Sequence, residues 1–150
     1  MSTGLLTQPK PRHKWQGKGR KVLIIDDDIS VAESLASILE RMGFQASWTT
    51  HGETGLAFAQ SEHPDLIILD LCLPDIDGLT VCQRLADGHQ TCGIPIIVVS
   101  GWEREDIVRT VRAAGGTYFL RKPYDPRALL VLIEYALREV EAWRDGLAGD

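Results

Sequence analysis

Short apolar runs recur along the chain, and each has the length of a β-strand. Residues 22–25, 66–69 and 94–99 are almost wholly apolar, as expected of strands that are buried on both faces of a sheet. Residues 44–49 alternate apolar and polar side chains, which indicates a half-exposed edge strand. A run at residues 118–120 completes the set of predicted strands.

The segments between these runs carry apolar residues at helical spacing. In the first segment Val31, Leu35 and Ile38 share one face, and Gly43 ends the helix. The other helices are predicted at residues 53–60, after Gly78 through Val81 and Leu85, at 103–113 and at 125–144. Five strands alternating with five helices predict an α/β fold with a parallel sheet covered on both faces. Right-handed crossovers make a doubly wound arrangement the simplest topology.

The charge is distributed unevenly between a basic start and an acidic remainder. Residues 1–19 are rich in Pro, Gly and Lys without a hydrophobic period, so we expect a disordered basic arm. The domain is predicted at residues 20–144 and a short tail at 145–150. Residues 1–21 hold six of the 16 Lys and Arg and none of the 21 acidic residues, which leaves the rest with a net charge of −11. Such an acidic domain is a poor nucleic-acid binder. A solvated arm without a specific role is favoured over a partner contact through its lysines and arginine, which are Lys10, Arg12, Lys14 and Lys18.

No apolar run is long enough to cross a bilayer, and the first residues hold only the pair Leu5-Leu6. We therefore expect a cytoplasmic protein without a membrane partner. The three cysteines, Cys72, Cys82 and Cys92, form no CxxC and lack metal-site spacing, which favours reduced thiols.

Polar residues end four of the predicted strands. The first strand is followed by Asp26, Asp27 and Asp28, the third by Asp70, the fourth by Ser100 and the fifth by Lys122. Taken singly, each could be a helix cap, a turn former or a surface side chain, and Asp28 fits a cap. In a doubly wound sheet, however, the carboxyl ends of the strands meet in one crevice, where such folds bind ligands.

Three carboxylates held close together repel one another, and a cation relieves that repulsion. All-oxygen ligation favours Mg²⁺, and Lys122 supplies a further positive charge. A carboxylate nucleophile, a metal and an ammonium group are suited to accepting a phosphoryl group.

These segments resemble the receiver domain of bacterial two-component response regulators over about residues 20–140. The motifs that carry the resemblance are KVLIIDDD, PDLIILDLCLPDIDG, IPIIVVSG and GGTYFLRKPY. The resemblance implies the flavodoxin-like receiver fold, with five strands in the order 2-1-3-4-5 and five helices. It also implies a phosphorelay protein rather than an enzyme, limited to self-catalysed phosphotransfer and autodephosphorylation.

The resemblance assigns a role to each of these positions. Asp70 is the phosphoacceptor. Asp27 binds Mg²⁺ directly, Asp26 assists through water, and the backbone carbonyl of Cys72 is a further ligand. Lys122 pairs with the phosphoryl oxygens, and the Lys122-Pro123 bond is expected to be cis. Ser100 moves toward the phosphate, and Phe119 is the aromatic switch that turns inward with it.

Partners also follow from the resemblance. A sensor histidine kinase or a phosphotransfer protein is expected to dock near residues 29–35. An unidentified output protein reads the surface formed by residues 103–113, 118–120 and 125–144, which could also form a homodimer. The motifs depart from common patterns at Gly101 and Trp102, and we hypothesise that Cys72 and Trp102 tune how fast water reaches the acyl phosphate.

Four alternatives stay open. The first is the N-terminal receiver of a truncated DNA-binding transcriptional regulator. The second is a magnesium-dependent phosphohydrolase, although Asp70-Leu71-Cys72 lacks a second acid two positions after Asp70. The third is a receiver-like scaffold that is never phosphorylated. Flavin or nucleotide binding is weaker, because the loop after the first strand is acidic and has no GxGxxG.

Overall fold

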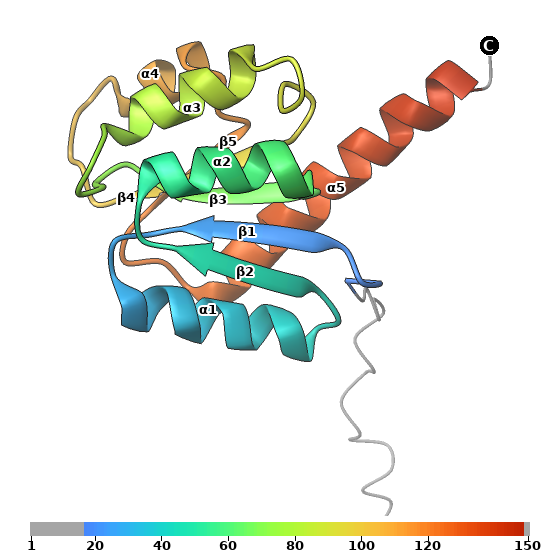
Figure 1. Ribbon diagram of the computed structural model, residues 1–150, viewed down its shortest axis with the longest axis horizontal. Helices are drawn as coiled ribbons and strands as arrows, with labels where there is room; N and C mark the ends of the chain where they lie inside the picture. The colour runs from blue at the N-terminus through green and yellow to red at the C-terminus, as the bar shows by residue number, and fades with distance from the viewer. Residues whose placement is uncertain (1–16, 149–150) are drawn as a thin grey trace, which may run out of the picture.

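Five parallel strands form one sheet, and helices cover both of its faces (Figure 1). The computed structural model describes residues 17–148, so residues 1–16 of the predicted basic arm and residues 149–150 of the predicted tail lie outside the described part of the chain. In chain order the elements are β1 (Lys21–Ile25), α1 (Ile29–Arg41), β2 (Gln45–Thr49), α2 (Gly52–Glu62), β3 (Leu66–Asp70), α3 (Gly78–Asp87), β4 (Ile96–Ser100), α4 (Ile107–Ala113), β5 (Tyr118–Arg121) and α5 (Pro126–Ala148).

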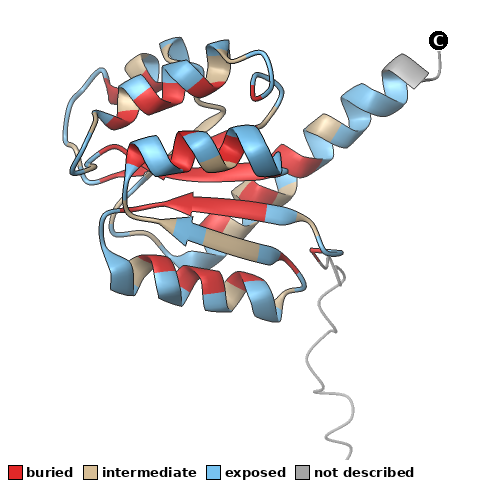
Figure 2. Ribbon diagram, in the orientation of Figure 1, coloured by how far each residue is buried: buried red, intermediate tan, exposed pale blue. Residues whose placement is uncertain are grey.

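The strand order is β2-β1-β3-β4-β5, and every neighbouring pair is parallel. This confirms the predicted α/β fold and its order 2-1-3-4-5. β3 and β4 are buried along their whole length, whereas β2, at the edge, is half-buried to exposed (Figure 2). The apolar runs and the one alternating run therefore distinguish the interior strands from the edge strand β2.

Alternate side chains of each strand enter two different cores. Val22 and Ile24 of β1 point to the face covered by α1 and α5, where they pack with Leu39 and Ile133. Leu23 and Ile25 point to the opposite face, where α2, α3 and α4 supply the partners. The sheet is thus fixed from both sides, and its carboxyl edge is left to the loops.

Two helices differ most from their predicted bounds. α4 begins at Ile107 rather than at residue 103, because Arg104 and Asp106 pair side chain to side chain and the Arg104 carbonyl closes a turn with the amide of Ile107. α5 extends to Ala148, four residues beyond the predicted end. Residues 141–146 are exposed, so no apolar period marks this last part of α5 as helical. Among the described residues, no helix is both long and apolar enough to cross a membrane.

The loop between β3 and α3 is tied to the start of α2 by Asp75. Its two carboxylate oxygens accept hydrogen bonds from the amides of Gly52 and Glu53, at 2.8 and 2.9 Å. The bond from Glu53, first among several backbone hydrogen bonds, lowers the pKa of the Asp75 carboxyl below its ordinary value. Asp75 thus satisfies two amides that the helix cannot pair internally.

We expect Asp75→Ala to lower the urea midpoint of unfolding at neutral pH. Because the carboxyl pKa is lower in the folded state, the stabilisation is present above the unfolded pKa and is lost as the pH falls through the folded one. The two unfolding midpoints should therefore converge below about pH 4. At neutral pH the urea midpoint of Asp75→Asn, which keeps one acceptor oxygen, should lie between those of the wild type and Asp75→Ala. A difference between the wild type and Asp75→Ala that persists in acid would contradict the stabilising role of the Asp75 carboxylate.

Candidate acidic site at the carboxyl edge of the sheet

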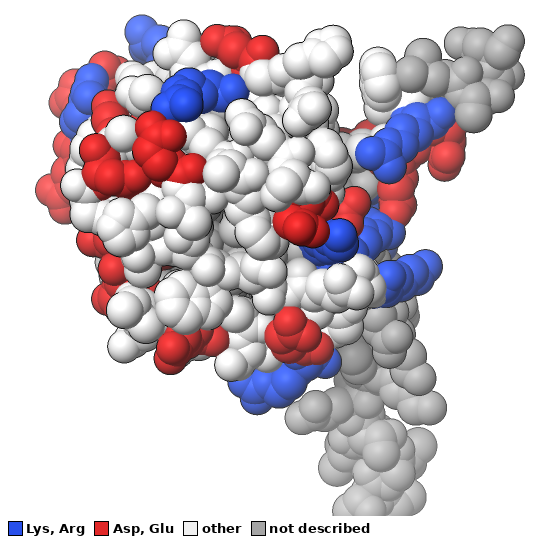
Figure 3. Space-filling view, in the orientation of Figure 1, with Lys and Arg blue, Asp and Glu red and all other residues white. Residues whose placement is uncertain are grey.

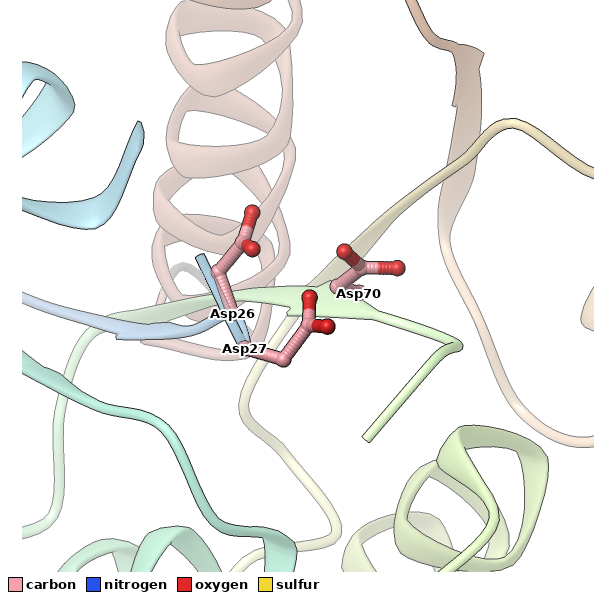
Figure 4. A group of neighbouring side chains, drawn as sticks. All are labelled: Asp26, Asp27 and Asp70. Atoms are coloured by element: carbon pink, nitrogen blue, oxygen red, sulfur yellow. The ribbon is translucent and has the colours of Figure 1, made fainter. Parts of the chain in front are cut away.

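Three aspartates from two neighbouring strands meet at the carboxyl edge of the sheet. Asp26 and Asp27 follow β1, and Asp70 is the last residue of β3. One carboxylate oxygen from each lies within 4.8 Å of the others (Figure 4). Asp26 and Asp70 are buried, whereas Asp27 is exposed, so the cluster opens to solvent on one side.

Lys122, just after β5, bridges the two buried carboxylates. Its Nζ donates to Asp26 Oδ2 at 2.9 Å and to Asp70 Oδ2 at 2.8 Å. The backbone amide of Lys122 also donates to the Ser100 carbonyl at 2.9 Å, which fixes the lysine at the end of β4. Strand ends that are far apart in sequence thus converge on one ammonium group, as predicted from the polar strand endings.

The second oxygen of each buried carboxylate accepts from a backbone amide. Asp26 Oδ1 accepts from the Asp28 amide at 2.9 Å, and Asp70 Oδ1 accepts from the Cys72 amide at 3.0 Å. The side chain of Asp28 caps α1 by accepting from the Val31 amide, which confirms the predicted cap. The orientation of both carboxylates is therefore set by the loops that follow their strands.

Burial and ion pairing act in opposite directions on these groups. Burial raises the pKa of the Asp70 carboxyl, and the hydrogen bonds from Lys122 and the Cys72 amide only partly offset it. Burial alone would lower the pKa of the Lys122 ammonium, but its hydrogen bonds to Asp70 and Asp26 outweigh burial and raise it. Lys122 is thus held in its charged form, whereas the anionic form of Asp70 depends on nearby cations.

Ser100 and Phe119 lie on the neighbouring strands β4 and β5. Ser100 is fully buried, and its Oγ accepts from the Trp102 amide at 3.1 Å. Phe119 is half-buried and packs against the core on the α2–α4 face. In the sheet register Asp70 pairs with Val99, the residue before Ser100, and Phe119 pairs with Val98. The Ser100 hydroxyl is engaged by its own loop.

The donor set fits Mg²⁺. This ion is bound by oxygen ligands, usually one or two carboxylates with several waters retained. Asp27 is exposed and has a carboxylate oxygen within 4.8 Å of those of Asp26 and Asp70. The side chain of Cys72 is exposed. A hard divalent ion would offset the excess of three carboxylates over one ammonium group.

Tyr124 was missed by sequence reasoning. The ring is half-buried, and it lies close enough to Lys122, Asp26 and Asp70 for their charges to act on its hydroxyl, whose pKa is raised mainly by burial. Its position two residues after Lys122 is the only signal of this in the sequence.

Comparison with known proteins agrees with this geometry. Residues 22–134 match the family described as the response regulator receiver domain. PilH from Pseudomonas aeruginosa is 30% identical over 117 residues, which cover 78% of this chain and 97% of PilH. RpaA from Synechocystis, a DNA-binding dual master transcriptional regulator, is 34% identical over 122 residues, which cover 81% of this chain. The match covers only 50% of RpaA, so the chain spans about half the length of this regulator.

Solved structures show the same fold. A CheY-like receiver domain protein from Methanospirillum hungatei superposes with a TM-score of 0.78 at 29% identity, covering 83% of this chain and 98% of that one. The chemotaxis protein CheY4 from Vibrio cholerae superposes with a TM-score of 0.74 at 28% identity. With its strand order, its acidic cluster and these matches, the chain belongs to the receiver domain family of two-component response regulators.

Proposed function

We propose that Asp70 accepts a phosphoryl group from the phosphohistidine of a sensor histidine kinase or of a phosphotransfer protein. The observation that carries this proposal is the setting of Asp70, a buried carboxylate bridged through Lys122 to Asp26 at 2.8 and 2.9 Å. An anionic nucleophile needs a nearby cation in order to approach an anionic phosphoryl group. In this site the ammonium group of Lys122 is that cation, and it is held in place beside Asp70.

In the proposed transfer, one Asp70 carboxylate oxygen forms a bond to phosphorus while the donor's P–N bond breaks. The electron pair of that bond returns to the imidazole of the donor, and Asp70 becomes an acyl phosphate. Mg²⁺, when held by Asp26, Asp27, Asp70 and the Cys72 carbonyl, supplies neutralisation of the phosphoryl oxygens. Lys122 supplies a fixed positive charge on the same oxygens, and the Asp28 and Cys72 amides keep the two carboxylates oriented.

The phosphoryl group would then act on Ser100 and Phe119. The Ser100 hydroxyl is bonded to the Trp102 amide, so donation to a phosphoryl oxygen requires that contact to be exchanged. Phe119, on the adjacent β5, would turn inward with it and change the surface of α4, β5 and α5. An output protein in the cytoplasm, or a second copy of the domain, would read that surface.

A second candidate is the receiver part of a longer DNA-binding regulator. It is favoured by the similarity to RpaA, of which the matching region forms only half. Both candidates accept the phosphoryl group at the same site. They differ only in what responds to the phosphorylated domain, which is a separate protein in the first case and a DNA-binding part of the same protein in the second.

Incubation with Mg²⁺ and a small acyl-phosphate donor tests the proposal. We expect the intact mass to rise by one phosphoryl group, the label to be labile to hydroxylamine, and peptide mapping to place it on Asp70. Chelation of Mg²⁺ should prevent labelling. A label on another residue, or steady turnover of a phosphomonoester, would contradict the proposal and in the second case favour a phosphohydrolase.

The lifetime of the acyl phosphate should depend on Cys72 and Trp102. Trp102 packs against the core on the α2–α4 face, and its backbone amide donates to the Ser100 hydroxyl. Cys72 follows Asp70 by two residues and has an exposed side chain. Replacing both with serine removes apolar bulk beside Asp70 and Ser100 in the sequence, which we expect to admit water more readily and to make dephosphorylation several-fold faster. The measurement is decay of the labelled mass after donor removal, and an unchanged half-life would contradict the hypothesis.

A further inference from the structure

An open groove lies between α1 and the edge strand β2, away from the acidic site. Its volume is about 610 Å³, and its walls include Glu33, Ser37 and Arg41 of α1 and Trp48 of β2. Trp48 is 38% exposed, which is unusual for so large an apolar side chain. The groove therefore combines an exposed apolar ring with charged side chains of both signs.

The edge of β2 beside the groove has backbone groups available for pairing with another strand. The Gln45 amide and the Thr49 carbonyl form hydrogen bonds toward β1. By alternation, the amides and carbonyls of Ala46 and Trp48 face the outer edge. Glu40 Oε1 accepts from the Ala46 amide at 2.9 Å, so the amide and carbonyl of Trp48 are the open pair along this edge.

The edge of β2 carries none of the usual features that prevent strand pairing. Exposed edge strands of natural proteins are commonly protected by lysine, proline or a bulge. Residues 44–50 read FQASWTT and hold no proline and no charged side chain. β2 also pairs with β1 in an unbroken register from Gln45 to Thr49, so no bulge turns the edge away. The edge is therefore suited to pairing with a further strand.

The charges along the α1 wall of the groove complement themselves when the wall is reversed. Glu33 and Arg41 both line the groove and are separated by about 12 Å of helix. Neither forms an ion pair within the described part of the chain. Acidic side chains lie along α1, and basic ones gather toward the end that leads into β2 (Figure 3). A wall with the same charges in the opposite direction would match this one, whereas a partner of a single charge sign would meet a like charge.

A two-fold axis through Trp48 satisfies both the strand edge and the charges. Around such an axis two copies of β2 run antiparallel, and each Trp48 amide donates to the Trp48 carbonyl of the other copy. Glu40 joins α1 to Ala46, and from Ala46 to Trp48 the strand advances about 6.6 Å, which equals about four residues of helix. Because α1 and β2 run in opposite directions (Figure 1), the axis passes α1 about midway between Glu33 and Arg41. Glu33 of each copy then lies opposite Arg41 of the other.

We propose that the chain forms a two-fold dimer through the edge of β2, in which the two sheets become one continuous sheet and the two α1 helices lie antiparallel on the same face of it. Backbone pairing at Trp48 and ion pairs between Glu33 and Arg41 of different copies hold the interface. Glu40 keeps its bond to the Ala46 amide, so the pairing centres on Trp48.

The β2 interface leaves the other functional surfaces of the domain open. β2 and β5 are opposite edges of the sheet, so the surface of α4, β5 and α5 is not covered. On the other side of α1, Val31 and Ile38 line a separate hollow with Tyr124, and this hollow also stays accessible. The acidic site lies at the carboxyl edge of the sheet, so we expect the dimer to form without phosphorylation and to leave Asp70 accessible.

Sedimentation velocity of the full chain, without a phosphoryl donor, tests the proposal. We expect a species of twice the monomer mass whose share grows with protein concentration. Trp48→Pro removes the outward amide and the exposed ring but none of the bonds to β1, and proline is tolerated at an edge position that faces solvent. This variant should weaken dimerisation by at least about tenfold. A wild type that stays monomeric up to about 1 mM would overturn the proposal.

Charge exchange tests the two-fold arrangement. Glu33→Lys alone, or Arg41→Glu alone, places like charges opposite one another and should weaken dimerisation by roughly tenfold at low salt. The combined variant restores opposite charges between copies related by the axis, so its dimerisation should return close to that of the wild type. High salt should bring the single variants and the wild type closer together, because exposed charges are screened. A combined variant that dimerises as weakly as the single ones contradicts the proposed pairing.

Two controls make the result specific to the β2 edge. Glu105→Lys, an equal change on an exposed residue before α4, and Trp143→Ala, which removes an exposed ring on α5, should leave dimerisation unchanged. A dimer that is lost in Trp143→Ala and kept in Trp48→Pro would refute the proposal, because α5 would then form the interface. Cooperative urea unfolding of dilute Trp48→Pro, and its normal labelling on Asp70, should show that the variant is folded. The result on dimerisation is thus independent of the result on phosphoryl transfer.

Discussion

Asp70→Asn is expected to take up no phosphoryl group, even though the protein remains folded. The amide has the shape of the carboxylate and still offers an oxygen to the Cys72 amide, which now donates to Asp70 Oδ1 at 3.0 Å. It has no anionic oxygen to form the acyl phosphate, so the loss of labelling should be complete. Intact mass after incubation with Mg²⁺ and an acyl-phosphate donor measures it.

Stability separates this loss from unfolding. Because burial raises the pKa of the Asp70 carboxyl, the ionised group opposes folding at neutral pH, and a neutral amide removes that cost. The urea midpoint of Asp70→Asn should therefore equal or exceed that of the wild type. Asp87→Asn, an exposed change at the end of α3, is the matched control and should be labelled normally. Labelling of Asp70→Asn at the wild-type level would contradict the assignment of the phosphoacceptor.

The fold could be predicted because the burial of each strand in an α/β protein determines which of its residues are apolar. Strands such as Leu66–Asp70 are buried on both faces and read as continuous apolar runs, whereas β2 reads as an alternation. The errors lie where burial gives no signal. The start of α4 is displaced by the local pair of Arg104 with Asp106, and residues 141–146 of α5 are exposed.

The convergence of Asp26, Asp70 and Lys122 was predictable for a topological reason. Parallel strands bring their carboxyl ends to one edge, so polar residues after apolar runs had to meet there. The hydrogen-bond pattern was not predictable from the sequence. That Lys122 bridges both buried carboxylates, and that Ser100 is held by Trp102, depends on loop conformations. Asp75 is a similar case, because its partners at Gly52 and Glu53 lie more than 20 residues away.

Lys122→Met should damage both stability and phosphotransfer. Methionine keeps most of the length of the side chain but leaves Asp26 and Asp70, whose side chains are 3% and 6% exposed, without their cation. Removing one partner from such a pair costs about 3–5 kcal/mol when it is fully buried, and we expect about 2–3 kcal/mol here because Lys122 is 25% exposed. Removing fixed charge from the transferred group should slow labelling by roughly 10²–10³-fold.

The pH and Mg²⁺ dependence of Lys122→Met identifies the cause of the lost stability. Without the ammonium group the pKa of Asp70 should rise further, so protonation favours the folded variant. The difference in free energy of unfolding between variant and wild type should therefore be largest at neutral pH and shrink as the pH falls through that raised pKa. Mg²⁺ should stabilise the variant more than the wild type, because the ion replaces the missing charge, and Lys122→Arg should keep most of the stability. A variant as stable as the wild type at neutral pH in the presence of a chelator would show that the Lys122 bridge between Asp26 and Asp70 carries no net stabilisation.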